Sequence, residues 1–315
     1  MNDSQVLMLM PHIKVVEAEG YFIVYDLAAR KLFQAAEAET VLLAGFIKKS
    51  IADIQVAEQT GAVGLMQALE TLIRDQVVFC IEAEELDQYP EIAPTYDSPS
   101  WIETLEVDVG SYSVPWIPKI QDLVFQLQPT AILFNLLQDP ETSFLSFLNE
   151  LPTGTVYIQL DGLDVGAELL DQLLRVPRVF GVLQGQQFFM LANGKVLARP
   201  FQIPKFNVNA TVFRQSLQYH TYFYKRLYID VQGAIKNAKE LPHTVGHLAD
   251  YTTKAQLLSW IQSAEFTRYW AIRKDECEEC RTCCFRYACI DKRVPLDKKT
   301  TEGFYGFSSN CSYKK

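Results

Sequence analysis

The sequence predicts an α/β protein built from more than one folding unit. Three observations lead to this class. Strand-length apolar segments alternate with amphipathic helical segments between residues 101 and 185, a shorter mixture of strands and helices precedes them, and six of the seven cysteines fall between Cys277 and Cys311. The chain has 315 residues, which is longer than one average domain. We therefore expect an N-terminal unit, a central α/β unit and a cysteine-rich C-terminal unit.

The composition indicates a globular protein that binds neither nucleic acid nor a membrane. Hydrophobic residues make up 49% of the chain and charged residues 21%, with a net charge of -9. Nucleic acids and anionic membrane surfaces both require a basic face. No apolar run approaches the roughly 20 residues that cross a bilayer. The first ten residues contain no basic segment and no cleavage site, so we expect no signal peptide and a cytoplasmic location, where thiols stay reduced.

The first unit, residues 1–81, has the pattern of a winged-helix-like module. Alternating or apolar segments at 13–17, 21–26 and 31–33 predict strands, and Val77–Ile81 predicts a further one. Between them, apolar residues recur at helical spacing, for example at Leu65, Leu69 and Leu72. A module of this kind either captures a peptide as an added strand or serves a purely structural role. Both interpretations remain open from the residues alone.

Residues 82–100 predict an extended, solvated linker, because they contain six acidic residues, three prolines and no Lys or Arg. From residue 101 to about 225 the pattern predicts a partial α/β barrel or an open α/β sheet. Its strands are expected at 102–109, 130–135, 155–160 and 179–183, and its helices at 115–127, 140–151 and 166–174. Carboxylates stand near strand ends, and we interpret them as turn residues and solvated charges: Glu106, Asp108, Asp161 and Asp164.

The last unit, residues 226–315, carries the strongest chemical signal. Thiolates are soft ligands that bind iron–sulfur clusters or zinc, and cysteines crowded in a cytosolic chain favour metal ligation over disulfides. Three of them form a Cys-x2-Cys-x5-Cys pattern, and a fourth follows at a distance. We predict these four as the metal ligands: Cys280, Cys283, Cys289 and Cys311. Cys277 and Cys284 are left over as extra or alternative ligands. A zinc site of four thiolates and cysteines without function are the competing interpretations.

The tail resembles a SPASM domain, the cluster-binding extension of radical S-adenosylmethionine enzymes that modify peptides. The segment Leu227–Asn237, followed by Gly246-His-Leu248, resembles the hairpin that leads into such a domain. Over nearly its whole length, the chain is similar to the SPASM-domain peptide maturases of grasp-with-spasm systems. Gly20–Leu27, the strand after Trp101 and the stretch Cys284–Cys289 also fit that family.

The resemblance implies one 4Fe–4S cluster on the four predicted ligands. A fuller SPASM pattern has a cysteine where this chain has Ala238 and another in the region of Ile290–Arg293, and both belong to a first auxiliary cluster. Radical S-adenosylmethionine chemistry needs a Cys-x3-Cys-x2-Cys loop after the first barrel strand. This chain has Gly110–Trp116 there, without a cysteine. We therefore expect a degenerate radical S-adenosylmethionine-like barrel that binds no S-adenosylmethionine.

In the family, the maturase accompanies an ATP-grasp ligase and a small precursor peptide. The resemblance implies an iron–sulfur accessory protein in ribosomal-peptide (RiPP) biosynthesis, which binds the precursor leader through residues 1–81 and presents the peptide to the ligase. The alternatives are a peptide-modifying iron–sulfur enzyme and a zinc-stabilised scaffold without catalysis. Four cysteine ligands would leave no open position on a metal for Lewis-acid chemistry, which argues against the enzyme.

Overall fold

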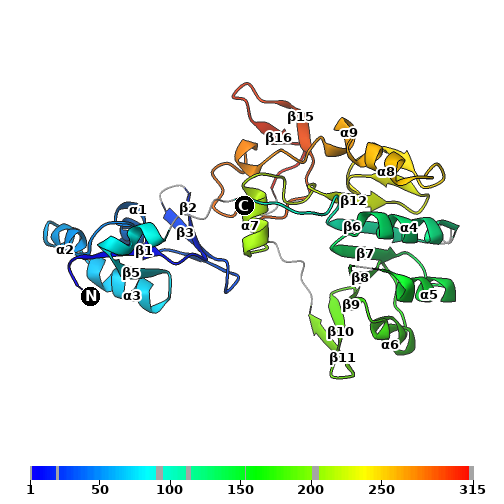
Figure 1. The fold of residues 1–315 in the computed structure, drawn as a ribbon, viewed down its shortest axis with the longest axis horizontal. Helices are drawn as coiled ribbons and strands as arrows, with labels where there is room; N and C mark the ends of the chain where they lie inside the picture. The colour runs from blue at the N-terminus through cyan, green and yellow to red at the C-terminus, as the bar shows by residue number, and fades with distance from the viewer. Residues whose placement is uncertain are drawn as a thin grey trace.

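The computed structural model describes residues 2–18, 21–89, 95–110, 115–152, 154–200 and 206–311. It is a mixed α/β structure, as the sequence predicts. Figure 1 shows the N-terminal unit, in blue, at one end of the molecule and a large sheet covered by helices at the other. Within the described residues, no helix combines the length and the apolar character needed to span a membrane.

In its described residues, the N-terminal unit contains two small sheets and three helices. Its elements are β1 (Gln5–Leu9), β2 (Ile13–Ala18), β3 (Tyr21–Asp26), β4 (Lys31–Gln34), α1 (Glu37–Gly45), α2 (Ile51–Gln59), α3 (Leu65–Arg74) and β5 (Val78–Glu82). Strands β2, β3 and β4 form an antiparallel sheet in that order, which confirms the three expected strands. Helix α3 buries Leu65, Leu69 and Leu72 on one face, as its spacing predicts.

Strand β1 is a finding that the sequence pattern did not reveal. It pairs antiparallel with β5, with Leu7 opposite Cys80. Leu7 packs into the core beneath the helices, whereas Val6 and Met8 pack on the other face with Ile81. Because both faces are covered, the strand is a continuous apolar run without the alternation that marks a half-exposed strand.

The expected extended linker begins with a short helix instead. Residues Ala83–Gln88 form the 3₁₀ helix η1, and Leu86 packs against the apolar face of β1 and β5. Tyr89 then makes an edge-to-face contact with Phe79, with the ring centroids 5.5 Å apart. The acidic composition is compatible with this helix because its acidic side chains can stay in solvent while Leu86 turns inward. Residues 90–94 of the expected linker lie outside the described part of the chain.

The central unit is a nine-stranded mixed sheet in the order β11-β10-β9-β8-β7-β6-β12-β13-β14. Its elements up to residue 200 are β6 (Thr104–Val109), α4 (Ile117–Leu127), β7 (Ala131–Leu136), α5 (Thr142–Glu150), β8 (Thr155–Leu160), α6 (Ala167–Arg175), β9 (Val179–Gln184), β10 (Gln187–Ala192) and β11 (Lys195–Pro200). Strands β6 to β9 run parallel, in agreement with the predicted alternation of strands and helices. Helices α4, α5 and α6 cover one face of this sheet (Figure 1).

The sheet continues beyond the expected boundary at residues 225 and 226. Strand β12 (Arg226–Ile229) pairs in parallel with β6, and the hairpin to β13 (Ala234–Lys236) and β14 (Gly246–His247) extends the same sheet. The apolar core beneath α4 to α6 includes residues of both parts, such as Leu105 and Leu227. The central and C-terminal parts therefore share one core.

The remaining elements of the described chain lie between residues 206 and 311. They are α7 (Ala210–Ser216), α8 (Lys254–Ile261), α9 (Ala264–Thr267), the 3₁₀ helix η3 (Lys274–Glu276), β15 (Pro295–Lys299) and β16 (Tyr305–Phe307). Helix α8 begins at Thr253, whose side chain accepts a hydrogen bond from the backbone N–H of Gln256. Helix α7 begins in the same way at Asn209.

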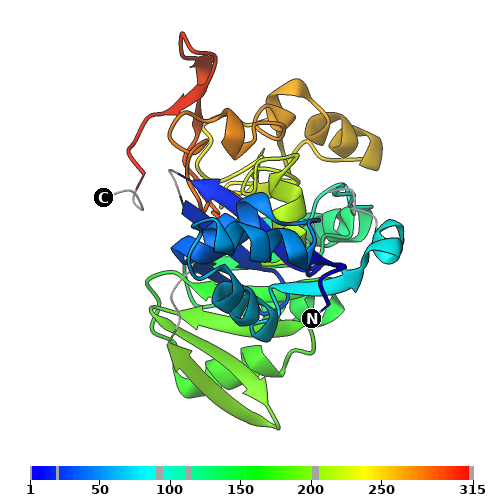
Figure 2. The ribbon, with the colours of Figure 1, turned by 90° about the vertical axis from the view of Figure 1, so that its left-hand side faces the viewer.

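The N-terminal unit contacts the rest of the molecule through its three-stranded sheet. Apolar residues of β2 and β3 pack with α7 and the cysteine-rich segment in one buried cluster, which includes Tyr25, Phe213, Cys284 and Ala288. The Tyr25 hydroxyl donates a hydrogen bond to the carbonyl oxygen of Cys284. Figures 1 and 2 place this unit on the side of the large sheet opposite to α4–α6.

Candidate metal centre

Consecutive turns bring the cysteines of the 277–289 segment together. The backbone N–H of Cys280 donates to the carbonyl of Cys277 at 3.0 Å, and that of Cys283 donates to Cys280 at 2.9 Å. The N–H of Cys289 closes a further turn on Phe285 at 3.0 Å. Turns of this kind need no regular helix or strand, so closely spaced side chains can point toward one centre.

All four predicted ligands line one cavity of about 350 Å³. Cys280, Cys283 and Cys289 come from the turn segment, and Cys311 returns to the cavity from the end of the chain. All seven cysteines of the chain are free thiols. The two separated stretches of polypeptide that carry the predicted ligands therefore meet at a shared space.

The two leftover cysteines occupy different positions. Cys277 is fully buried but does not line the cavity, and its thiol donates to the carbonyl of Arg273 at 3.5 Å. Cys284 does line the cavity, and its sulfur accepts a hydrogen bond from the Tyr21 hydroxyl at 3.6 Å. The structure thus places Cys284, but not Cys277, beside the four predicted ligands.

Burial favours the protonated form of Cys277, Cys280 and Cys289 in the absence of a metal. Burial raises the pKa of Cys280 to about 11 and the pKa of Cys289 to about 12, and the nearby Lys274 charge opposes part of each rise. Cys277 has its pKa raised to about 12 for the same reason. A metal that binds Cys280 and Cys289 must therefore displace protons.

Across the described ranges, no group of three or more His, Cys, Asp or Glu side chains is arranged to hold a single metal ion. The wall of the cavity nevertheless carries a feature that suits an anionic group. Lys274 is 1% exposed, lines the cavity, and its Nζ has no hydrogen-bond partner among the described residues. A cluster bound by four thiolates carries negative charge and sulfur acceptors, so the residues present fit such a group.

The carboxylates Glu106 and Asp108 are not solvated turn residues, contrary to the sequence-based interpretation. Both are buried on the face of β6 that points away from α4 and α5. The Asn135 amide on β7 donates to Glu106 at 3.0 Å and to Asp108 at 2.7 Å. Arg226 pairs with Glu106 at 2.7 Å, and the Tyr228 hydroxyl donates to Asp108 at 2.7 Å. Lys239, which follows β13, pairs with Asp108 at 3.1 Å. The two carboxylates and two cations therefore balance within a network that joins β6, β7, β12 and Lys239.

No local pattern in the sequence reveals this network. Arg226 and Tyr228 lie 120 residues from the carboxylates that they contact, and the parallel pairing of β12 with β6 is what brings them together. The one available signal is the i, i+2 spacing of Glu106 and Asp108, which places both on the same face of a strand.

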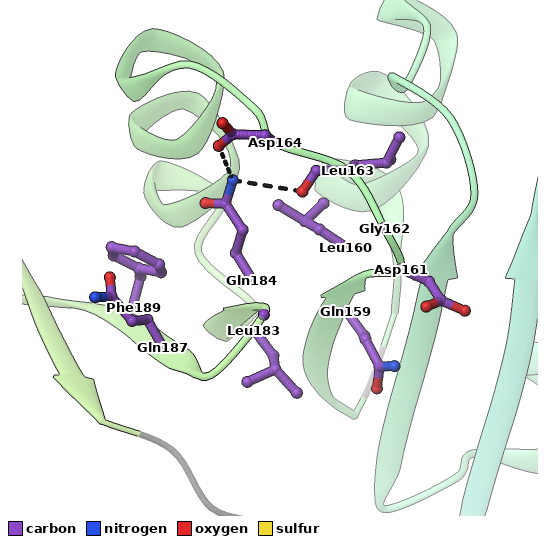
Figure 3. A pocket seen from close by; sticks show the side chains of 11 residues that line it. Gln159, Leu160, Asp161, Gly162, Leu163, Asp164, Leu183, Gln184, Gln187 and Phe189 are labelled. Carbon is purple, nitrogen blue, oxygen red and sulfur yellow. Dashed lines mark hydrogen bonds between the residues drawn. The ribbon is translucent and has the colours of Figure 1, made fainter.

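A second cavity, of about 620 Å³, lies at the carboxyl ends of β8 and β9. Figure 3 shows Gln184 reaching toward Asp164, to which its amide donates at 2.7 Å. Asp161 and Asp164 line this cavity and are exposed, in agreement with their interpretation as solvated charges. Although this cavity is larger, its polar lining consists of amides and carboxylates that are partly or fully exposed. The cysteine cavity offers the more specific chemistry.

The chain matches no model of a known protein family and no curated protein.

Proposed function

We propose that this protein is an iron–sulfur accessory protein in the maturation of a ribosomally made peptide. In this function, Cys280, Cys283, Cys289 and Cys311 hold one 4Fe–4S cluster. The N-terminal unit binds the leader of the precursor peptide, and the protein presents the peptide to an ATP-grasp ligase. The observation that carries the proposal is the single cavity lined by all four cysteines of the SPASM-like motif.

The cavity supports a cluster because its donors come from both ends of the cysteine-rich region. When bound, a cluster would cross-link the 280–289 turns to the Cys311 segment and could carry an electron. The protein's own residues would position the loops. Arg286, for example, donates to the carbonyl of Cys283 at 2.9 Å and pairs with Asp275 at 3.0 Å. Its guanidinium thereby ties the turn that carries Cys283 to η3.

The N-terminal sheet supports leader binding because one of its edges is open. Within the described residues, β4 is paired only with β3. The backbone N–H of Ala35 donates to the carbonyl of Phe22, and hydrogen-bonded pairs alternate along an antiparallel ladder. The backbone N–H and C=O of Phe33 therefore point toward β3, and those of Gln34 point toward the free edge. An extended leader peptide can add to this edge as a further strand.

Anaerobic purification tests the cluster. We expect a brown protein that contains iron and acid-labile sulfide, and we expect the Cys283→Ala variant to lose most of both. Cys80→Ala is the matched control, because Cys80 lies on β5 and outside the cavity, so its loss should leave the iron content unchanged. A colourless wild-type protein that contains zinc would instead establish the zinc-stabilised scaffold.

Titration with a labelled leader peptide, alone and with the ligase, tests peptide binding. The Gln34→Pro variant removes one outward backbone donor and leaves the inward bonds of β4 in place, so we expect affinity to fall at least tenfold. Gln34→Ala retains that donor and should bind as the wild type does. If neither the wild type nor its mixture with the ligase binds the leader, the accessory function is wrong.

A further inference from the structure

The wall of the cysteine cavity contains a positive charge that the fold buries without giving it a hydrogen-bond acceptor. Lys274, on η3, is 1% exposed, and its ammonium nitrogen has no hydrogen-bond partner among the described residues. A buried ammonium is costly to desolvate unless it is paired and hydrogen-bonded. A residue of this kind indicates that a group able to accept hydrogen bonds from its ammonium belongs beside it.

The nearest carboxylate is already occupied by another residue. Asp291 accepts hydrogen bonds from the Arg293 guanidinium at distances between 2.8 and 3.1 Å, through both of its oxygens. Lys274 approaches Asp291 only to 3.4 Å, as an ion pair without a hydrogen bond. Arg293 therefore occupies the hydrogen-bond acceptors of Asp291. The N–H groups of Lys274 remain available to donate hydrogen bonds to another acceptor.

The surroundings of Lys274 direct that acceptor toward the cysteines. On one side, the ammonium lies 5.4 Å from the centre of the Phe307 ring, which offers no strong acceptor. Lys274 also lines the cavity together with Cys280 and Cys289, and its charge acts on the thiols of both. Burial, together with the Lys274 charge, lowers the pKa of His220, so that imidazole is neutral, and the cysteine cavity is the side on which an anionic acceptor would be stabilised.

We propose that Lys274 is a positioning residue that donates a hydrogen bond to the cysteine-bound cluster and stabilises its more negative, reduced form. This inference rests on the proposed function, because it requires a cluster on Cys280, Cys283, Cys289 and Cys311. Reduction adds one electron to the iron and takes up no proton, so the negative charge of the site increases. A buried ammonium interacts more favourably with that larger charge and raises the reduction potential.

The test compares the anaerobically purified Lys274→Met protein with the wild type in a dithionite titration followed by electron paramagnetic resonance. Methionine retains the volume of the side chain and removes its charge and its protons. We expect the variant to show a lower reduction potential. Lys292→Met is the matched control, because it makes the same substitution at a lysine whose side chain is 71% exposed and which lies outside the cavity. Solvent screens an exposed charge, so the potential of this control should be unchanged.

A second measurement separates this assignment from a purely structural ion pair. In the metal-free protein, Lys274→Met removes a buried ammonium that has no acceptor, so the urea midpoint should stay the same or rise. A structural pair with Asp291 predicts a lower midpoint instead. If Lys274→Met abolishes cluster binding, Lys274→Arg restores the charge, and we expect it to restore the iron content.

The outcomes distinguish the two proposals. A wild-type protein without iron overturns the proposed function and this inference with it. A wild-type cluster whose potential is the same in Lys274→Met overturns the assignment of Lys274 alone. A lower urea midpoint for metal-free Lys274→Met, or a Lys274→Arg protein as poor in iron as Lys274→Met, overturns it too.

Discussion

The contact between Tyr25 and Cys284 should control how often the N-terminal unit separates from the cysteine-rich segment. Tyr25 is fully buried, its hydroxyl donates to the Cys284 carbonyl, and its ring makes an edge-to-face contact with Phe213 at 5.5 Å. The variant Tyr25→Phe retains the ring and removes only the hydroxyl. Separation of the two parts should expose Cys284, which is 5% exposed in the closed arrangement.

The expected magnitude follows from the hydrogen bond. A buried hydrogen bond contributes about 1 kcal/mol, and a buried carbonyl left without a donor costs about 1–3 kcal/mol. We take about 1.4 kcal/mol as the net loss, which corresponds to a tenfold increase in the population of the open form. The thiol of Cys284 should then react about tenfold faster.

Alkylation of the metal-free, reduced protein, with the modified cysteines identified by mass spectrometry, measures this rate. Cys80 on β5 is an internal reference, because it reports unfolding of the N-terminal unit itself. Its rate should not change in Tyr25→Phe. The matched control is Tyr89→Phe, which removes a hydroxyl from a tyrosine that is 43% exposed and packs against Phe79 of the same unit.

Two results would refute this reasoning. Equal acceleration at Cys80 and Cys284 would mean that Tyr25 stabilises the unit internally and does not hold it against the cysteine-rich segment. An unchanged rate at Cys284 would mean that the hydrogen bond contributes nothing to docking.

Three further predictions concern stability. Glu106→Gln should lower the free energy of unfolding by about 1.5–3 kcal/mol in urea denaturation, because it leaves the partly buried guanidinium of Arg226 without its charge partner; a loss below about 1 kcal/mol would contradict this. Gly246→Ala should destabilise the protein by about 1–3 kcal/mol in the same assay, since the new Cβ would lie 2.5 Å from the Trp260 ring; wild-type stability would show that the ring can move freely. The metal-free protein should lose stability above about pH 9, because burial raises the pKa of Cys277 in the folded state from 9.0 to about 12. As the pH rises, Cys277 releases its proton in the unfolded chain before it does so in the folded protein. Its contribution to stability is therefore complete below pH 9 and is lost as the pH rises toward about 12, by at most about 1.4 kcal/mol per pH unit. Cys277→Ala should reduce this slope in urea midpoints measured from about pH 8 to 10.

The repeating part of the fold could be predicted because its signal is local. The strands and helices between residues 104 and 184 lie within two residues of their predicted bounds, since each has its own apolar periodicity and turn residues. Strand β1 and the helix η1 were missed for the opposite reason. β1 is covered on both faces and shows no alternation, and the single large apolar residue of η1, Leu86, is hidden among acidic residues.

In the candidate site, too, the local features could be predicted from the sequence and the long-range contacts could not. The spacing of Cys280, Cys283 and Cys289 is local, and the turns that bring them together follow from it. The residues that surround the cysteines come from distant parts of the chain. Lys274 is an ordinary lysine in the sequence, and its burial depends on Phe307, which lies more than thirty residues further along the chain. The burial of a charge and its partners therefore become visible only in the folded structure.

The parallel pairing of β12 with β6 also bears on how the chain can be made in pieces. A fragment that stops before Arg226 would leave the full length of β6 as an open edge, with Glu106 lacking its guanidinium partner. During synthesis, β6 would remain an unpaired edge strand until the hairpin that begins with β12 has emerged from the ribosome. Separate expression of the helix-covered sheet and the cysteine-rich end should therefore give aggregates, whereas a cut within residues 90–94, ahead of the sheet, leaves β6 its partner.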